Sequence, residues 1–341
     1  MGYVSEVRRW IKTHGNYNDP CPGVDFDFIT EDVCNYLRER AKTTKALSGV
    51  LSALKQMGMI CGQVLHTSKF QQPSLQYQKL RSAVSRLHKG RRDAGLDTGV
   101  DQAIGTGRFA NSLLLSGFSV FSFKYFHRIH PLHREFIVCG AMQYKSCSRF
   151  GLFNETTPLQ KHLHFAAHIN SYRLASTFRK THKSNRPYSL TFPVDPSDDT
   201  DAFTVRHPAG PTMMTAGTLI HWHLRSLTHT YGNQDVNAPL FPLMARLPNR
   251  RASFAKWLRE MYTLVLPVGS TIPARIRPHS NRAGWLTDHA RAGTSSEHMM
   301  AHGRWKSRVA MNTYIRPLVS DLCHSSAFRY IPKSIRKKCN A

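Results

Sequence analysis

The fold is decided by HSNRAGWLTDHARAGTSSEHMMAHGRWKSRVAMNTYIRP, residues 279–317. Its first piece has the pattern of a short helix, with His279 and Arg282 near the start and Gly293 after the end. Because residues three positions apart lie on one face of a helix, the imidazole and the guanidinium project from the same side. The stretch therefore predicts a helix that presents a base and a cation together.

Two further short helices are predicted in the same stretch. TSSE at 294–297 has the spacing of a capping box, so the second helix begins there and runs to about Ala301. The third covers 306–315 and ends before Pro317. Besides the first pair, the stretch carries His302, Trp305 and Tyr314. A soluble core has no use for so many groups that need hydrogen-bond partners when buried, so we interpret the set as a site that binds a phosphate and attacks it.

The whole chain is strongly basic. Its 341 residues include 47 Lys and Arg against 21 Asp and Glu, a formal net charge of +26. Such a field attracts polyanions, and neutralising their phosphates releases condensed counterions, so nucleic acid is the expected partner. The alternative interpretation is a solvated basic surface that only aids solubility.

Several classes of protein are not expected. No run of about eighteen uncharged apolar residues marks a membrane span, and the N-terminal MGYVSEVRRWIKTHG lacks the apolar centre of a signal peptide. The seven cysteines are scattered without CxxC spacing, which indicates reduced thiols rather than a disulfide framework or a zinc site. We expect an intracellular protein without membrane contact, nuclear if its source is eukaryotic.

Hydrophobic periodicity divides the chain into two predicted domains. Helical patterns fill 30–66 and 74–95, and a Gly- and Asp-rich segment at 95–107 is predicted to be a linker. We therefore expect a helical DNA-binding domain with its linker over 1–105 and a second domain over 106–341.

The second domain is predicted to mix helices and strands. Helical patterns cover 130–150, 215–232 and 250–265, and alternating runs at 162–168, 172–178 and 186–192 are predicted strands. The last two strands are joined by the basic turn RKTHKSN at 179–185, and the polar, acidic segment 193–203 is predicted to be a loop. Helices, then strands, then helices again indicate an α+β fold, mainly helical with a small antiparallel sheet.

The polar residues of 279–317 follow a spacing found in a known family. The order is H-x-x-R, then Trp305 twenty-three residues after Arg282, then Tyr314 nine residues after the Trp, followed by Ile-Arg. This resembles the C-terminal half of the tyrosine recombinases, the phage-integrase family. HSNRAGWLTDHARAG, HGRWKS and NTYIR are especially similar to Cre-like enzymes and to recombinases of crypton- and DIRS-type eukaryotic mobile elements.

The resemblance implies two more site residues upstream. YKSCSRFGLF at 144–153 has the shape of the family's first box, which places its first Arg at Arg149. An acidic residue usually follows that Arg by three positions, but here Leu152 stands there. The family's Lys lies on the turn between two strands, commonly as Lys-Thr, which matches Lys180, with Lys183 as the alternative.

The resemblance implies site-specific cutting and rejoining of DNA without metal, ATP or another cofactor. A phenol ordinarily has a pKa near 10, so a cationic cluster and a base must help Tyr314 to attack. Arg149 and Arg282 would each fork onto non-bridging phosphate oxygens, and His279 would assist proton movement. Lys180 would protonate the leaving 5′ oxygen. Trp305 stands where many relatives have His, and its indole N–H can donate to a phosphate oxygen.

The resemblance also implies an assembly. Members of the family close a C-shaped clamp on double-stranded DNA, with the N-terminal helices on one side, and act as homotetramers. Basic residues at 88–92, with Lys306 and Arg308, are candidates for backbone contacts. The segment 320–331 is amphipathic enough to be the family's C-terminal helix that docks into a neighbouring subunit, with Leu322, Ala327 and Tyr330 as possible anchors. Docking onto its own chain is the alternative.

Competing interpretations remain at the level of sequence. Leu152 favours a catalytically inactive DNA-binding descendant of a mobile-element recombinase, and a type IB topoisomerase would use similar chemistry without Trp305. His302 is an alternative candidate for the site position assigned to Trp305. The nine-residue spacing to Tyr314 favours Trp305, so His302 is expected behind the site or on the surface. The HWH of 221–223 is not expected to bind metal, because alternate positions on a helix face apart.

Overall fold

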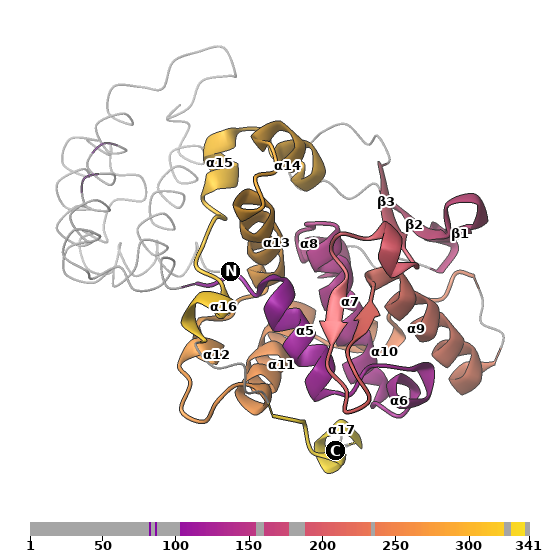
Figure 1. Ribbon diagram of the computed structural model, residues 1–341. Coiled ribbons are helices and arrows are strands. Elements are labelled where there is room, and N and C mark those ends of the chain that lie inside the picture. The colour runs from indigo at the N-terminus through magenta and orange to yellow at the C-terminus, as the bar shows by residue number, and fades with distance from the viewer. Residues whose placement is uncertain are drawn as a thin grey trace, which may run out of the picture. The chain divides into compact units, whose positions relative to one another are not determined.

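The computed structural model describes residues 82, 86, 103–154, 160–176, 188–232, 236–323 and 329–337. The chain separates into two units, Met1–Gln102 and Ala103–Ala341, and all but two of the described residues belong to the second (Figure 1). The predicted N-terminal helices and basic run at 88–92 lie outside the described residues. So does the turn that carries Lys180 and Lys183.

The second unit is mainly helical. Its helices, in chain order, are α5 (Gly107–Gly117), α6 (Phe123–His127), α7 (Pro131–Lys145), α8 (Gly151–Asn154), α9 (Ala216–Tyr231), α10 (Pro242–Arg246), α11 (Arg250–Val265), α12 (Ile272–Arg275), α13 (Ser280–Arg291), α14 (Ser296–Gly303), α15 (Arg308–Asn312), α16 (Val319–Leu322) and α17 (Lys333–Lys337). The predicted helices over 130–150, 215–232 and 250–265 are confirmed as α7, α9 and α11. Caps explain their starts, because Thr215 and Asn249 accept hydrogen bonds from backbone N–H groups two or three residues into α9 and α11.

A small antiparallel sheet lies beside these helices. Its strands β1 (Leu163–Ala166), β2 (Ser171–Ser176) and β3 (Tyr188–Pro193) pair in the order β1-β2-β3, and β4 (Phe203–Val205) pairs with β5 (Thr212–Met214). The three strands predicted from alternation are confirmed. Leu174 stands in register between Leu163 and Leu190, and helix α9 packs against β2 and β3. The predicted α+β fold with a small antiparallel sheet is thus confirmed for the described part of the chain.

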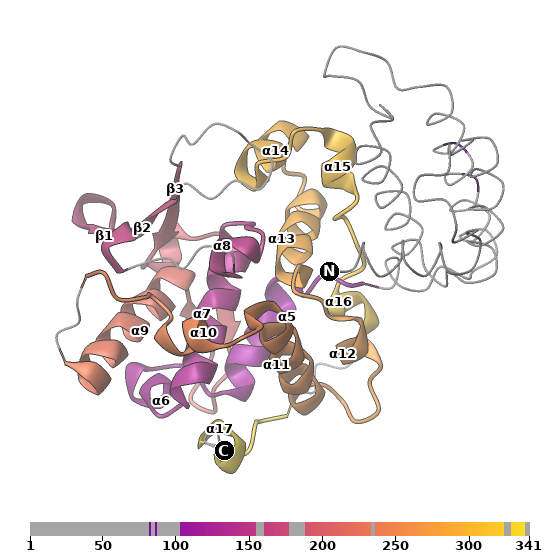
Figure 2. The same cartoon turned by 180° about the vertical axis from the view of Figure 1, so that it is seen from behind.

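The core is formed where α5, α7, α11 and α13 meet. Aromatic rings fill much of it: Phe118 stacks on Trp257 with centroids 6.2 Å apart, and Phe150 stacks on Phe254 at 4.7 Å. Both views place α14 and α15 at one end of the unit and α6 and α17 at the other (Figures 1 and 2). No helix within the described part is long and apolar enough to cross a bilayer.

The end of the predicted linker is part of this core. Ile104 and Thr106 are fully buried, and Gly105 exchanges backbone hydrogen bonds with Pro317 and Val319 at 2.9 and 3.0 Å. A Cβ on Gly105 would come within 2.9 Å of the α13 backbone, so only glycine fits this close approach. The prediction of a flexible linker up to residue 107 is therefore wrong for its last residues. They are hydrogen-bonded to the chain at the end of the 279–317 stretch and just beyond it.

The C-terminal segment packs on its own chain. Helix α16 ends at Leu322 rather than running on through 331 as predicted. After the next few residues, Arg329 and Ile331 hydrogen-bond through their backbone N–H groups to Val265 and Gly117, at 3.1 and 3.0 Å. Ile331 is fully buried. Residues 329–337 thus follow the alternative of docking in cis. Ala327 lies outside the described residues, and Tyr330 is 47% exposed.

Candidate active site

Helix α13 carries the first two predicted site residues. His279 stands at its N-cap position, and Arg282 lies one turn further with only 2% of its surface exposed. The Arg282 guanidinium donates from Nη1 to the carbonyl of Cys147 and from Nη2 to that of Gly303, the latter at 2.8 Å. These bonds hold Arg282 between the end of α7 and the end of α14.

Trp305 and Tyr314 pack around this guanidinium. The Arg282 Cζ atom lies 4.0 Å from the centre of the Trp305 ring and 5.3 Å from that of Tyr314. The Tyr314 ring centroid is 5.6 Å from Trp305 and 6.4 Å from His279. Four of the six residues predicted for the site therefore lie together.

Both aromatic residues lie outside helices, as the predicted bounds imply for Trp305 but not for Tyr314. Helix α15 covers only Arg308–Asn312, and Tyr314 follows it in a turn where its N–H donates to Met311 at 2.8 Å. Trp305 lies between α14 and α15. The predicted third helix, 306–315, is too long, because Ser307 caps it late and the chain turns toward the site before Pro317.

The end of α14 has an unusual residue. Trp305 N–H donates to Met300 at 3.0 Å and Arg304 N–H to Ala301 at 3.2 Å, the hydrogen bonds of a Schellman motif. Arg304 adopts the left-handed conformation, with φ at 56°, which costs a residue with a Cβ about 1–2 kcal/mol. Glycine occupies the preceding position instead, since a Cβ on Gly303 would come within 1.7 Å of the Trp305 ring.

The start of α14 also differs slightly from prediction. Its N-cap is Ser295, whose hydroxyl accepts from the N–H of His298 at 3.2 Å. The capping residue is thus one position later than the TSSE spacing predicted.

Three guanidiniums gather at the site, those of Arg149, Arg282 and Arg304; we call them the cationic site. Burial lowers the pKa of Arg282, and the positive charges of Arg149 and Arg304 lower it further, whereas Cys147 and Tyr314 raise it. Among the described ion pairs none joins Arg149 or Arg282 to a carboxylate. Like charges so close in a partly dry environment repel, so the arrangement fits the binding of an anion.

Two buried donors of the site lack an acceptor among the described residues. They are Nε of Arg282 and Nε1 of Trp305. Buried N–H groups almost always have a hydrogen-bond partner, and an oxygen-rich ligand such as a phosphate would supply one. The arrangement could therefore hold an anion against the phenol of Tyr314, with the imidazole of His279 beside it.

Leu152 does not replace the acidic group of the family's first box. It is buried in the core at 2% exposure. Among the described residues, two carboxylates at Lys145, the last residue of α7, come from 193–203, the segment predicted to be a polar, acidic loop. Asp199 and Asp201 are 4% and 6% exposed, so two acidic side chains of this predicted loop are buried.

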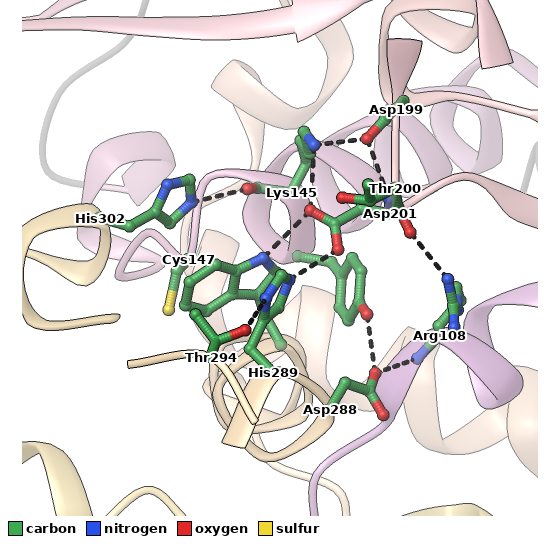
Figure 3. Close-up of polar contacts among 12 residues, drawn as sticks. Arg108, Lys145, Cys147, Asp199, Thr200, Asp201, Asp288, His289, Thr294 and His302 are labelled. Carbon is green, nitrogen blue, oxygen red and sulfur yellow. Dashed lines mark hydrogen bonds and ion pairs between the residues drawn. The ribbon is translucent and has the colours of Figure 1, made fainter. Parts of the chain in front are cut away.

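Asp199 and Asp201 form a carboxylate network with Lys145 and His289. Lys145 Nζ contacts both carboxylates, 3.0 Å from that of Asp201, and Nε2 of His289 lies 2.8 Å from the same group (Figure 3). The indole N–H of Trp285 donates to Asp201 at 3.2 Å. Burial alone would raise the pKa of Asp201, but His289 and Lys145 outweigh it and hold the pKa well below its usual range.

The network supports the segments that bind Arg282. Burial lowers the pKa of the Lys145 ammonium, yet Asp201 and Asp199 outweigh this and raise it overall. His302 lies against the Lys145 carbonyl at 3.0 Å and stacks on Trp285, with centroids 4.3 Å apart (Figure 3). Mainly because it is buried, the pKa of His302 falls to about 4. His302 therefore lies behind the site as a neutral ring.

Sequence reasoning missed Arg304, Lys145 and the two aspartates. The only sequence signal for the aspartates was the acidity of 193–203, and for Arg304 its place between Gly303 and Trp305. Neither signal predicts where in the folded chain these side chains lie.

Two other predictions about histidines and metals can be compared with the structure. In α9, His221 is exposed and lies 2.9 Å from the Tyr172 hydroxyl, whereas His223 is buried and lies 2.7 Å from the carbonyl of Leu240. The pair faces apart, as expected for alternate helix positions. Within the described ranges, no group of three His, Cys, Asp or Glu side chains could hold a metal ion.

Comparisons with known proteins add little to this geometry. No protein-family model matches the chain, and no curated protein matches it. Among solved structures, one described as "Flpe-Holliday Junction Complex" aligns with 98% of this chain and 88% of that chain, at 11% sequence identity and a TM-score of 0.37. A likeness of this size assigns neither a fold nor an activity, so the site has to be interpreted from its own contacts.

Proposed function

We propose that this chain breaks and rejoins DNA strands by the tyrosine-recombinase reaction, with Tyr314 as the nucleophile. The observation that carries the proposal is the position of the Tyr314 ring, 5.3 Å from the charge centre of Arg282. Arg282 is a buried guanidinium without a carboxylate partner among the described ion pairs. A phenol beside such a charge is suited to attack a bound phosphodiester.

The reaction follows from the chemistry of these groups. The phenol oxygen of Tyr314 forms a bond to phosphorus, the bond to the 5′ oxygen breaks, and a 3′-phosphotyrosyl link and a free 5′ hydroxyl result. Arg149 and Arg282 stabilise the negative charge on the non-bridging oxygens of the transition state. His279, 6.4 Å from Tyr314 between ring centroids, takes part in removing the phenolic proton. Lys180 delivers a proton to the leaving oxygen.

Trp305 contributes through its position. Its ring is 8% exposed, lies 4.0 Å from the Arg282 charge centre, and leaves its buried N–H for an oxygen of the bound phosphate. Attack by the 5′ hydroxyl of a second strand on the phosphotyrosyl bond reverses the chemistry and releases the enzyme. The proposed substrate is double-stranded DNA, and exchange between two duplexes requires a homotetramer.

The test is a search for a covalent adduct. The full chain is incubated with a pool of nicked duplexes of randomised sequence, on which loss of the short 5′-hydroxyl strand prevents religation, and DNA bound to denatured protein is isolated and sequenced. We expect wild-type protein to trap a defined sequence and Tyr314→Phe to trap none. Tyr125→Phe is the matched control, because Tyr125 lies on α6 and is 38% exposed.

The catalytically inactive DNA-binding descendant is the second candidate, and Leu152 at the position of the usual acid favours it. It predicts salt-dependent binding of DNA with no adduct from the wild-type chain. Relaxation of supercoiled plasmid without any site preference would instead indicate a type IB topoisomerase.

A further inference from the structure

Arg304 is the charged residue of this region that the proposed reaction does not yet use. It occupies the left-handed position at the end of α14, where glycine is most favoured. A residue held in a disfavoured backbone conformation beside a candidate site suggests that its side chain is needed there. The side chain reaches back toward the segment that follows α7.

The contacts of Arg304 bring its guanidinium to the segment that Arg282 also binds. Its Nη2 group donates to the hydroxyl of Ser148 at 2.8 Å and to the carbonyl of Ser146 at 3.3 Å. Arg282 donates to the carbonyl of Cys147, which lies between those two residues. The two guanidiniums therefore hold the same short segment, and Arg149 follows it directly in the chain.

The positive charges of the cationic site act on one another. Arg304 and Arg149 both act on Arg282 as repelling charges. Arg282 is almost fully buried, whereas Arg149 and Arg304 are partly exposed. Arg149 and Arg304 are therefore the members of the cationic site that solvent reaches more easily. Three guanidiniums around one anion match the charge that develops on a phosphate under attack.

We infer that Arg304 is a third phosphate-contacting guanidinium, which binds a non-bridging oxygen of the phosphodiester that Tyr314 attacks. This inference rests on the proposed function for the identity of the anion. The inference adds Arg304 to the proposed phosphate-binding residues. Neither the motif spacing nor the helix pattern in the sequence predicts this role.

The first experiment needs no DNA target. Thermal unfolding of the full chain is followed in inorganic phosphate and in chloride at equal ionic strength. We expect phosphate to raise the melting temperature of wild type and Arg304→Gln to lose at least about half of this rise, because the anion loses a charge-assisted hydrogen bond. The matched control is Arg251→Gln, an exposed arginine on α11, which keeps the full rise. An unchanged rise in Arg304→Gln overturns the inference.

The second experiment uses the sequence trapped by the wild-type chain. With an ordinary scissile phosphate, we expect Arg304→Gln to form the adduct roughly 10- to 100-fold more slowly than wild type, the range for loss of one charged hydrogen bond. With a methylphosphonate at that position, one non-bridging charge is absent, and the two proteins should react within about 3-fold of each other. A merely structural role predicts an equal defect on both substrates, and that result overturns the inference.

The two proposals fail in different ways. If the wild-type chain traps no DNA at all, the proposed strand-transfer function fails, while the phosphate-dependent melting still decides whether Arg304 binds an anion. If wild type traps DNA and Arg304→Gln does so at the same rate, the function stands and the role of Arg304 is refuted.

Discussion

Helix α13 contributes residues to two charged clusters, one made of like charges and one made of opposite charges. Toward its start, Arg282 belongs to the cationic site, where guanidiniums repel one another. Toward its end, His289 belongs to the carboxylate network, where Lys145 and Asp201 contact each other at 3.0 Å (Figure 3). The network pairs opposite charges with one another, whereas the described ion pairs join neither Arg149 nor Arg282 of the cationic site to a carboxylate.

The difference is between opposite charges that pair within the chain and charges of one sign that lie close together. Buried charges are tolerated when they are paired and hydrogen-bonded, which the carboxylate network achieves with groups of its own chain. A cluster of like charges is tolerated when a ligand completes it, and such clusters are typical of functional sites. Because His302 and the Lys145 carbonyl connect the two clusters, the network holds in place the backbone that binds Arg282.

The largest effect is expected from breaking the network. Asp201→Ala leaves the partly buried Lys145 without its second carboxylate and removes the acceptor for Trp285 and His289. Removing one partner of a buried charge pair typically costs about 3–5 kcal/mol of unfolding free energy. Urea unfolding of the variant measures it. Asp198→Ala, an exposed neighbour in the same segment, serves as the control and should stay within about 0.5 kcal/mol of wild type.

A smaller effect on stability but a strong one on the reaction is expected in the cationic site. Arg282→Lys keeps the charge, yet an ammonium cannot reach the carbonyls of Cys147 and Gly303 and a phosphate at once. Adduct formation on the trapped sequence should fall about 100-fold, as when one preorganised donor is lost. Equal rates for the variant and wild type would contradict a phosphate-binding role. Arg291→Lys, at the exposed end of the same helix, should react normally.

The pH dependence of stability sharpens the comparison further. His302 takes up a proton near pH 4 in the folded chain but near pH 6.5 when unfolded, so acidification between those values favours unfolding. Between pH 7 and pH 5 this residue should cost about 1–2 kcal/mol of stability. His302→Gln should flatten the curve measured by urea unfolding. The exposed His298→Gln should leave it unchanged, and the same flattening in both variants would refute the assignment.

The smallest effect is expected from an ion pair at the surface. Arg291 and Asp321 make two contacts, at 2.6 and 2.7 Å, but the Arg291 side chain is 52% exposed. Solvent-exposed pairs contribute about 0–1 kcal/mol, so Arg291→Ala should change the unfolding free energy by less than about 1 kcal/mol. A loss as large as that of Asp201→Ala would mean that exposure does not distinguish the two pairs.

Much of the fold was predictable because local patterns encode local structure. Helix α11 has the bounds that apolar periodicity predicted. Strand β1 lies within its predicted run, while β2 begins and β3 ends one residue beyond theirs. The spacing of His279, Arg282, Trp305 and Tyr314 also selected residues that the structure places side by side. Arg149 joins them through its electrostatic contact with Arg282, while Lys180 and the catalytic roles of all six residues stay predictions.

Contacts between distant segments were not predictable in the same way. Asp201 meets Trp285 across 84 positions of the chain, and Thr106 hydrogen-bonds Asn281 across 175. From sequence alone, an acidic segment is expected to be exposed to solvent and a glycine-rich segment to be flexible. Burial of either can be predicted only when the segment that packs against it is known. The left-handed Arg304 likewise contradicts local preference, since glycine would be expected at its position.

The sequence by itself determined the helices, the strands, the excess of positive charge and the set of residues around Tyr314. Periodicity and charge are properties of neighbouring positions, so they can be read without coordinates. Only the tertiary structure decided which charges form ion pairs within the described part of the chain and which guanidiniums lie close to one another. That distinction depends on burial and on distances of a few ångströms between segments far apart in the chain, where desolvation and Coulomb energies are largest.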